Sequence, residues 1–132
     1  MFSLREDGFA LNRDLQRHGR TIIEAWYRRE AAAYLPSRVA RFSAPWGLTA
    51  AGVRISGARH RWGSCSFHNT LSFAWRLVMA PPEVIDYVVV HELAHIREKN
   101  HGRGFWRMVE AMMPDYAEYR SWLKEKGSLL NL

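Results

Sequence analysis

Hydrophobic and polar positions near the start of the chain follow a helical period. In residues 20–35 (RTIIEAWYRREAAAYL) apolar side chains recur at three- to four-residue spacing and arginines occupy the opposite face, which predicts an amphipathic helix. Leu35 precedes Pro36, and the residue before a proline disfavours the helical conformation. We therefore expect this helix to break or kink there, with Ser37 capping a short continuation.

The middle of the chain switches to the two-residue period of β-strands. The stretches are residues 52–56 (GVRIS), 59–67 (RHRWGSCSF) and 70–79 (TLSFAWRLVM), of which the last alternates most clearly. His68 and Asn69 separate the last two stretches, and Asn tolerates the positive φ of a tight turn. The pattern predicts a small antiparallel sheet of about three strands.

Helical spacing returns in the last part of the chain. Residues 80–100 place Pro82 at a first helical position and continue as a nearly unbroken apolar run, so we expect this helix to be central. Residues 102–113 and 115–127 read as two further amphipathic helices. A helix, a small sheet and then helices make an α+β fold.

The composition fits one globular domain over residues 1–132, in which residues 1–19 carry no pattern that assigns an element. Hydrophobic content is 48%, which is enough for a real core. Cys65 is the single cysteine, so an internal disulfide framework is excluded and a reducing, cytoplasmic setting is expected. No stretch reaches the roughly 18 apolar residues of a membrane span, and we expect neither an export signal nor membrane association.

The basic residues are concentrated in the N-terminal part. Residues 1–61 hold 11 arginines and 5 acidic residues, whereas residues 62–132 hold 8 of each sign, so the formal charge of +6 lies before residue 62. Solvated helix faces account for such a distribution. The alternative is a basic surface for nucleic acid or a nucleotide, although no RNP, zinc-finger or P-loop motif accompanies it.

Titratable residues interrupt the apolar run of the central helix, in the stretch VVVHELAHIREKNHG (88–102). His91 and His95 are four residues apart, which places them about 40° apart around a helix and about 6 Å apart along it. Two imidazoles on one face can bind one metal ion, and the adjacent Glu92 is placed to hold a water rather than the ion. This is the H-E-x-x-H pattern of zinc hydrolases.

A catalytic zinc ion needs a third protein ligand. His101 supplies it if the chain turns back after Arg97, with Asn100 and Gly102 as turn residues. Glu98 is the alternative ligand. The remaining histidines lack partners at metal spacing and are expected to be surface or strand residues; they are His18, His60 and His68. Core histidines bonded to backbone, with the glutamate paired to an arginine, are the non-metal interpretation.

Longer blocks of sequence resemble the YgjP-like metallopeptidase family, which is related to the SprT-like and other minimal zinc proteases of the zincin type. The blocks that carry the resemblance are RWGSCS (61–66), LSFAWRLVMAPPEVIDYVVVHELAHI (71–96), NHG (100–102), FW (105–106) and MPDY (113–116). The resemblance implies a zincin-like domain with one Zn²⁺ on His91, His95 and His101, and Glu92 as catalytic base. The chain departs from the family at Ala74, where members often carry Asn.

The resemblance, together with the zinc pattern, predicts a metalloprotease that hydrolyses peptide bonds with a zinc-activated water. A polypeptide substrate is expected to add to the strand at 70–79. Candidate substrate-binding residues, some of which would also hold the developing oxyanion, are Arg61, Trp62, Trp75, Arg76 and Tyr116. Cys65 is expected to be a buried small hydrophobe.

Three other functions are compatible with these residues. A zinc site beside arginines could hydrolyse a nucleoside triphosphate. A SprT-like, DNA-associated protease would use the basic N-terminal part to bind DNA. A structural zinc site would need a closed shell of four protein ligands, for which only three good candidates are present.

Overall fold

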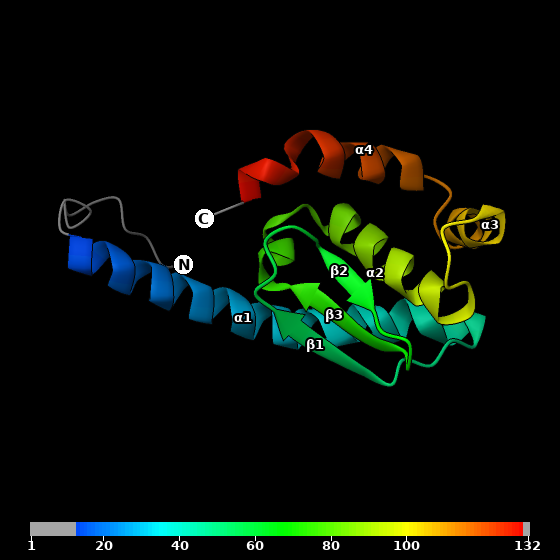
Figure 1. The fold of residues 1–132 in the computed structure, drawn as a ribbon, viewed down its shortest axis with the longest axis horizontal. Coiled ribbons are helices and arrows are strands. Elements are labelled where there is room, and N and C mark those ends of the chain that lie inside the picture. Colours follow the sequence, from blue (N-terminus) through cyan, green and yellow to red (C-terminus); the bar gives the residue numbers. More distant parts are fainter. Residues whose placement is uncertain (1–12, 131–132) are drawn as a thin grey trace.

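The computed structural model of the protein describes residues 13–130, with side chains from residue 17 onward, and has the expected α+β layout (Figure 1). In chain order its helices and strands are α1 (Arg13–Ser43), η2 (Ala44–Trp46), β1 (Gly52–Ser56), β2 (Gly63–Cys65), β3 (Thr70–Ala74), η3 (Trp75–Met79), α2 (Pro82–Arg97), α3 (Arg103–Met112), α4 (Tyr116–Lys126) and η4 (Gly127–Leu130). The later helices thus confirm the sequence prediction to within a few residues.

The sequence predicted a break or a kink at Pro36, but α1 continues through this residue as one long helix, so the break does not occur. Proline removes one backbone hydrogen bond from a helix interior, but Ala32 and Pro36 both lie on the exposed face, so water can solvate the carbonyl that loses its partner. Leu35 and Val39 anchor the flanking turns in the core, with 0% and 5% of their surfaces exposed. Ser37 does not cap a new helix, because its hydroxyl donates to the carbonyl of Tyr34 at 2.7 Å.

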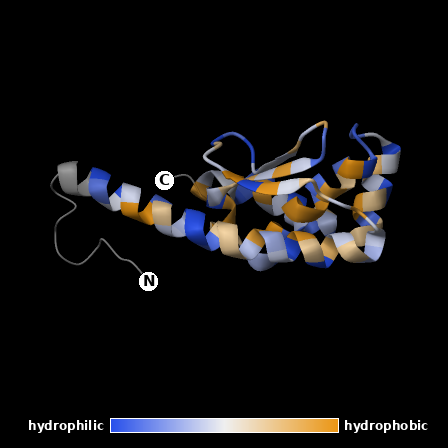
Figure 2. Cartoon of the chain, turned by 90° about the horizontal axis from the view of Figure 1, so that it is seen from below, coloured by the Kyte–Doolittle hydropathy of each residue, from blue (hydrophilic) through white to orange (hydrophobic). Residues whose placement is uncertain are grey.

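The N-terminal part of α1 extends beyond the rest of the described structure in both views (Figures 1 and 2). Figure 2 shows hydrophobic residues gathered where α1, the sheet and α2 face one another. No helix within residues 13–130 is both long and apolar enough to cross a membrane.

The sheet has the order β1-β3-β2. β2 pairs with β3 antiparallel, as expected, but β1 pairs with β3 in parallel, so the prediction of a purely antiparallel sheet is wrong. The turn between β2 and β3 contains Asn69 at a φ of 69°, which confirms the predicted tight connection. Because β3 lies in the centre, β1 and β2 are the two edge strands of the sheet.

Strand β3 ends at Ala74, although the alternating pattern predicted a strand through residue 79. Leu71 and Phe73 are fully buried in the alternating manner of a strand. From Trp75 to Leu77 three successive residues are buried, which a strand with one covered face cannot achieve. A 3₁₀ helix solves this, because it lets α1 cover one side of the segment while α2 covers another.

Helix α2 lies at the centre of the molecule and contacts α1, α3, α4 and β2. Ten of its 16 residues are buried, which explains the nearly unbroken apolar run in its sequence. Pro82 occupies its first turn, where a missing N–H costs nothing. Arg38 ties α1 to α2 by donating from Nε and Nη2 to the two carboxylate oxygens of Asp86, at 2.8 and 2.7 Å, and this hydrogen bonding raises the pKa of the Arg38 guanidinium.

Candidate metal centre

The second half of α2 brings three titratable side chains to one side of the helix. His95 and Glu92 are buried, with 9% and 4% of their surfaces exposed, and His91 is half-buried. Burial of polar groups at this depth costs several kcal/mol unless they find partners. The positions of these side chains therefore need a ligand or a hydrogen-bond network to account for them.

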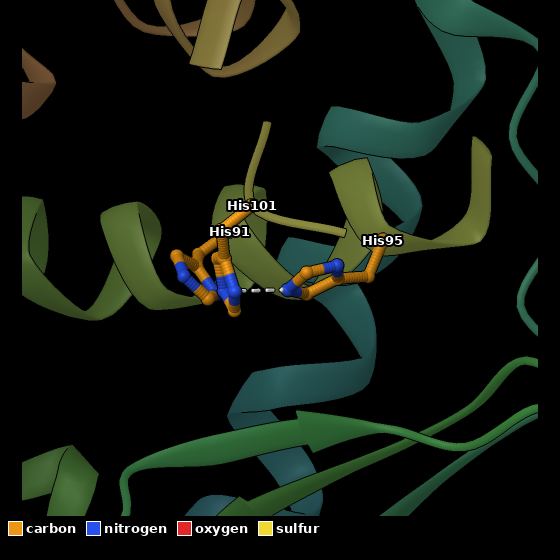
Figure 3. Close-up of side chains that lie close together, drawn as sticks. All are labelled: His91, His95 and His101. Atoms are coloured by element: carbon orange, nitrogen blue, oxygen red, sulfur yellow. Dashed lines mark hydrogen bonds between the residues drawn. The ribbon is translucent and has the colours of Figure 1, made fainter. Parts of the chain in front are cut away.

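A turn after α2 carries His101 back to the same place. The helix ends at Arg97, and Glu98 adopts an extended conformation with φ of −119° and ψ of 99°. Gly102 precedes α3 with φ of −87°, so the expected turn is present without any left-handed residue at Asn100 or Gly102. His101 is exposed and faces the two histidines of α2 (Figure 3).

The three imidazoles converge closely enough to hold one ion. One ring nitrogen from each residue lies within 4.8 Å of the others, and Nε2 of His95 lies 2.9 Å from Nε2 of His101. Two imidazoles on one tetrahedral Zn²⁺ place their ligand nitrogens about 3.3 Å apart, since Zn–N bonds are about 2.0–2.1 Å. The observed spacing fits a zinc ion after side-chain adjustments of an ångström or so.

Hydrogen bonds put the α2 histidines in the form that binds metals. Nδ1 of His95 donates to the carbonyl oxygen of Glu98 at 2.9 Å, and Nδ1 of His91 donates to Oε2 of Glu92 at 2.9 Å. Each bond leaves Nε2 as the unprotonated nitrogen, as in many metal sites. Desolvation, followed by the neighbouring His95 and His91, lowers the pKa of His101, which favours the neutral imidazole that a metal requires.

Two aromatic residues at the start of α3 support the imidazole rings. Phe105 is fully buried and stacks on His95 with ring centroids 4.3 Å apart, while His91 and His101 meet its ring at 5.0 and 4.9 Å. Trp106 lies farther out, 6.0 Å from the His91 ring. No pattern in the sequence predicted this supporting role for α3.

Glu92 lies against the backbone of the edge strand. A Cβ placed on Gly63 would come within 3.0 Å of Cγ and 3.2 Å of Oε2 of Glu92, so only glycine lets β2 approach the carboxylate this closely. Within the described residues no arginine pairs with Glu92, which removes the non-metal explanation in which an arginine neutralises it. The carboxylate has His91 as its hydrogen-bond partner.

Two cavities meet at the centre and share Gly63, His91 and Glu92 in their linings. The first, of about 310 Å³, runs along β2 and also contains Ser64, Cys65, His95, His101 and two cations, Arg61 and Lys99. The second, of about 220 Å³, is completed by Trp62, Tyr87, Val88, Leu123 and Arg120. Because these cavities are open to solvent, a substrate has access to the three histidines.

The predicted substrate-binding residues separate into two groups. Arg61 and Trp62 line the two cavities, and Tyr116 lies next to the centre, stacked on Trp106 with ring centroids 5.5 Å apart. Trp75 and Arg76 are instead buried against α1, with 1% and 3% of their surfaces exposed. They belong to the core because β3 ends before them, and the expectation that they contact the substrate is wrong.

Several residues at the centre were not predicted from the sequence. Tyr87 could have been found, because it precedes His91 by one helical turn, and burial raises its pKa to about 12. No pattern in the sequence placed Arg120 or Lys99 at the metal centre. Lys99 Nζ bonds to the amide oxygen of Asn69 and, at 3.4 Å, to the carbonyl of Phe67, so its charge has no acidic partner among the described residues.

Two other residues near the histidines do not join them as ligands. The carboxylate of Glu98 lies against Gly104 at the start of α3, and Glu98 is outside the cluster of converging ligand atoms. Cys65 is half-buried in the first cavity, where burial raises the pKa of its thiol. With three converging side chains and no fourth in residues 17–130, the cluster differs from a closed structural zinc site.

The sequence as a whole matches a known family. The model of the family described as YgjP-like, metallopeptidase domain, matches residues 4–126. The chain belongs to the YgjP-like metallopeptidase family. This confirms the resemblance and classes the chain with the metal-dependent hydrolases.

Individual relatives of this YgjP-like chain agree in fold and differ in described activity. The metallopeptidase zymogens abylysin from Pyrococcus abyssi and jannalysin from Methanocaldococcus jannaschii superpose with TM-scores of 0.60 and 0.61. They share 24% and 21% identity, and the matches cover 68% and 70% of this chain and 93% and 95% of theirs. They show that the fold is that of a minimal metallopeptidase.

A curated relative, the UTP pyrophosphatase of Escherichia coli (strain K12), is 30% identical over 80 residues, which are 58% of this chain. The match spans 48% of that protein, so the YgjP-like chain covers about half the length of this relative.

Proposed function

We propose that this YgjP-like chain is a zinc-dependent peptidase that hydrolyses peptide bonds at the His91–His95–His101 centre. The observation that carries the proposal is the convergence of three imidazoles beside the buried carboxylate of Glu92, in a cavity that follows an edge strand. Three protein ligands leave a position for water or substrate, as in catalytic zinc sites.

Each residue of the centre has a distinct task in this proposal. The three histidines would hold Zn²⁺, which when bound supplies a Lewis acid that polarises a carbonyl and acidifies water. Glu92 accepts the proton of the attacking water and passes it to the leaving amine. Its low exposure excludes bulk solvent from the carboxylate, and its contact with His91 holds it beside the metal ligands.

The substrate backbone would lie along β2. This strand pairs with β3 on one side, and its residues Gly63, Ser64 and Cys65 line the first cavity on the way to the histidines. An extended peptide can add to such an edge through main-chain hydrogen bonds. This assignment replaces the strand at 70–79, because β3 is the central strand and has no free edge.

Residues from α2 and α4 would stabilise the negative charge that develops on the scissile carbonyl. Arg120 lines the cavity shared with His91 and Glu92, and its guanidinium lies 4.5 Å from the centroid of the Trp106 ring. Tyr87 lies in the same cavity, and its raised pKa keeps the phenol protonated as a donor at neutral pH. Donors fixed near a developing oxyanion lower the activation barrier by several kcal/mol.

The proposal is tested by measuring zinc content and peptide cleavage together. Wild type should bind one Zn²⁺ and cleave unstructured polypeptide such as casein. Glu92→Gln should retain the metal and lose about 10²–10⁴-fold in rate, whereas the matched change Glu110→Gln on the exposed face of α3 should alter neither. Zinc-loaded wild type that cleaves no peptide, or an equally active Glu92→Gln variant, would exclude the peptidase.

A second candidate function is hydrolysis of a nucleoside triphosphate. Two observations favour it: a relative described as a UTP pyrophosphatase, and the cations Arg61, Lys99 and Arg120 around the centre. Cations near a metal can neutralise the charge of transferring phosphoryl groups. A screen for diphosphate release across the common nucleoside triphosphates separates this activity from peptide cleavage, and both are expected to depend on Glu92.

A further inference from the structure

A second group of charged residues lies where η3 meets α1, apart from the metal ligands. Its central member is Arg76, which has 3% of its surface exposed. Nη1 of Arg76 donates to the carbonyls of Gly57 and Ala58 at the long distances of 3.4 and 3.5 Å. Its Nε is fully buried and has no hydrogen-bond partner among the described residues. A buried guanidinium that carries a full charge on two weak bonds is costly.

The aromatic neighbour of Arg76 does not satisfy these donors. The guanidinium carbon lies 4.3 Å from the centroid of the Trp75 ring, which in turn stacks on Tyr27 of α1 at 5.9 Å. A ring below the guanidinium plane attracts the charge, but the N–H groups point within the plane and need acceptors there. The stack holds Arg76 in place and leaves its Nε without an acceptor among the described residues.

Two further arginines lie near this segment. Nη2 of Arg28 lies 2.9 Å from the point where a Cβ of Gly57 would be, and Arg59 follows the two carbonyl acceptors directly in the chain. Desolvation, then Arg59 and in smaller measure Arg28, lower the pKa of Arg76, against a raising effect of Glu24.

Among the described residues, Glu24 supplies the carboxylate that acts on Arg76, and this carboxylate is already engaged. Oε2 of Glu24 accepts a hydrogen bond from Nε of Arg28 at 2.9 Å. Three guanidinium groups against one carboxylate leave two positive charges in excess. A phosphate group carries about −1.5 to −2 charges at pH 7, and the planar forks of arginines match its oxygens.

We propose that Arg28, Arg59 and Arg76 form a phosphate-binding site. The half-buried Arg28 and the exposed Arg59 close over the oxyanion, while the buried Arg76 supplies fixed donors. A dianionic phosphate matches the excess charge, which a single carboxylate does not. The segment from Gly57 to Trp62 begins at this site and ends at the metal centre, so the two sites share one loop without sharing a residue.

The test is calorimetric titration of metal-free protein with inorganic phosphate at constant ionic strength, with acetate as the carboxylate comparison. We expect saturable binding of one phosphate and at least tenfold weaker binding of acetate. Arg28→Gln and Arg59→Gln should each weaken phosphate binding about tenfold, as expected for loss of one charge-assisted hydrogen bond. Arg29→Gln, the same change on the exposed neighbour in α1, should leave the affinity within twofold.

Three results would overturn the site. The first is the absence of saturable phosphate binding. The second is an equal effect of Arg29→Gln and Arg28→Gln, which would mean diffuse attraction by the basic surface. The third is sensitivity to Arg61→Gln instead, which would place the anion at the metal centre. Arg76→Met adds an independent measurement, because the melting temperature of this variant should no longer rise with phosphate. If Arg76→Met fails to fold, the affinities of Arg28→Gln and Arg59→Gln decide whether the site exists.

Discussion

His95 and His101 face each other with their Nε2 atoms 2.9 Å apart (Figure 3). The other ring nitrogen of His95, Nδ1, donates to the carbonyl of Glu98. Glu98, the first residue after α2, thus orients a ligand from the helix, and the turn that it begins delivers His101 from outside the helix. Helix end, turn and both imidazoles form one preorganised unit. The metal site depends on that unit as much as on the motif within the helix.

Replacing His101 by alanine should weaken zinc binding by more than about 100-fold, because loss of a ligand exceeds the 10–100-fold effect of losing a supporting hydrogen bond. The measurement is competition with a chromophoric zinc chelator at pH 7.5. His68→Ala, which removes an exposed histidine outside the cluster, is the matched control. Equal zinc affinity in the two variants would remove His101 from the ligand set.

Replacing Gly63 by alanine should impair catalysis and spare the metal. The new Cβ would meet Cγ of Glu92 at 3.0 Å and Cγ1 of Val88 at 3.1 Å, so the carboxylate has to move by a few tenths of an ångström. Displacement of a general base by this much is expected to lower kcat by about tenfold or more. Gly52→Ala, where a Cβ meets nothing within 4 Å, provides the comparison in the same assays of zinc content and turnover.

Replacing Pro36 by alanine should stabilise the protein by roughly 2 kcal/mol. Alanine restores the N–H that the interior of α1 lacks, a gain of about 3 kcal/mol in helix propensity that is partly offset because the unfolded chain becomes less restricted. Urea unfolding followed by circular dichroism measures the change. An unchanged or lower free energy of unfolding would show that the helix is adapted to the proline. Ser37→Ala, which removes the hydrogen bond to Tyr34, should instead be neutral or destabilising.

Alkylation of Cys65 should be slow at pH 8 and should accelerate only above the pH at which a free cysteine reacts. Burial is the largest influence on this thiol and raises its pKa above that of a free cysteine, against an opposing effect of Lys99, so the fraction of reactive thiolate at a given pH is reduced. Iodoacetamide labelling of metal-free protein between pH 7 and 11 gives the titration curve. In Lys99→Gln the curve should move to still higher pH, since a nearby cation is lost. A midpoint below that of free cysteine would contradict this assignment.

The sequence by itself determined the elements that rest on local periodicity and the residues that share one helix face. The apolar run of α2 fits a central helix, because no amphipathic alternative buries so many valines. His91, Glu92 and His95 follow from the 3.6-residue repeat once that helix is known. The turn at Asn69 follows from the tolerance of asparagine for positive φ.

Other features depend on long-range packing, and only the tertiary structure decided them. Pro36 remains inside α1 because Leu35 and Val39 on either side are anchored in the core. Residues 75–79 leave the strand conformation because both sides of the segment are covered. Strand order made β2 the edge beside the metal centre, and the approach of α3 and α4 supplied Phe105 and Arg120. These outcomes depend on burial against distant segments, which a local pattern does not encode.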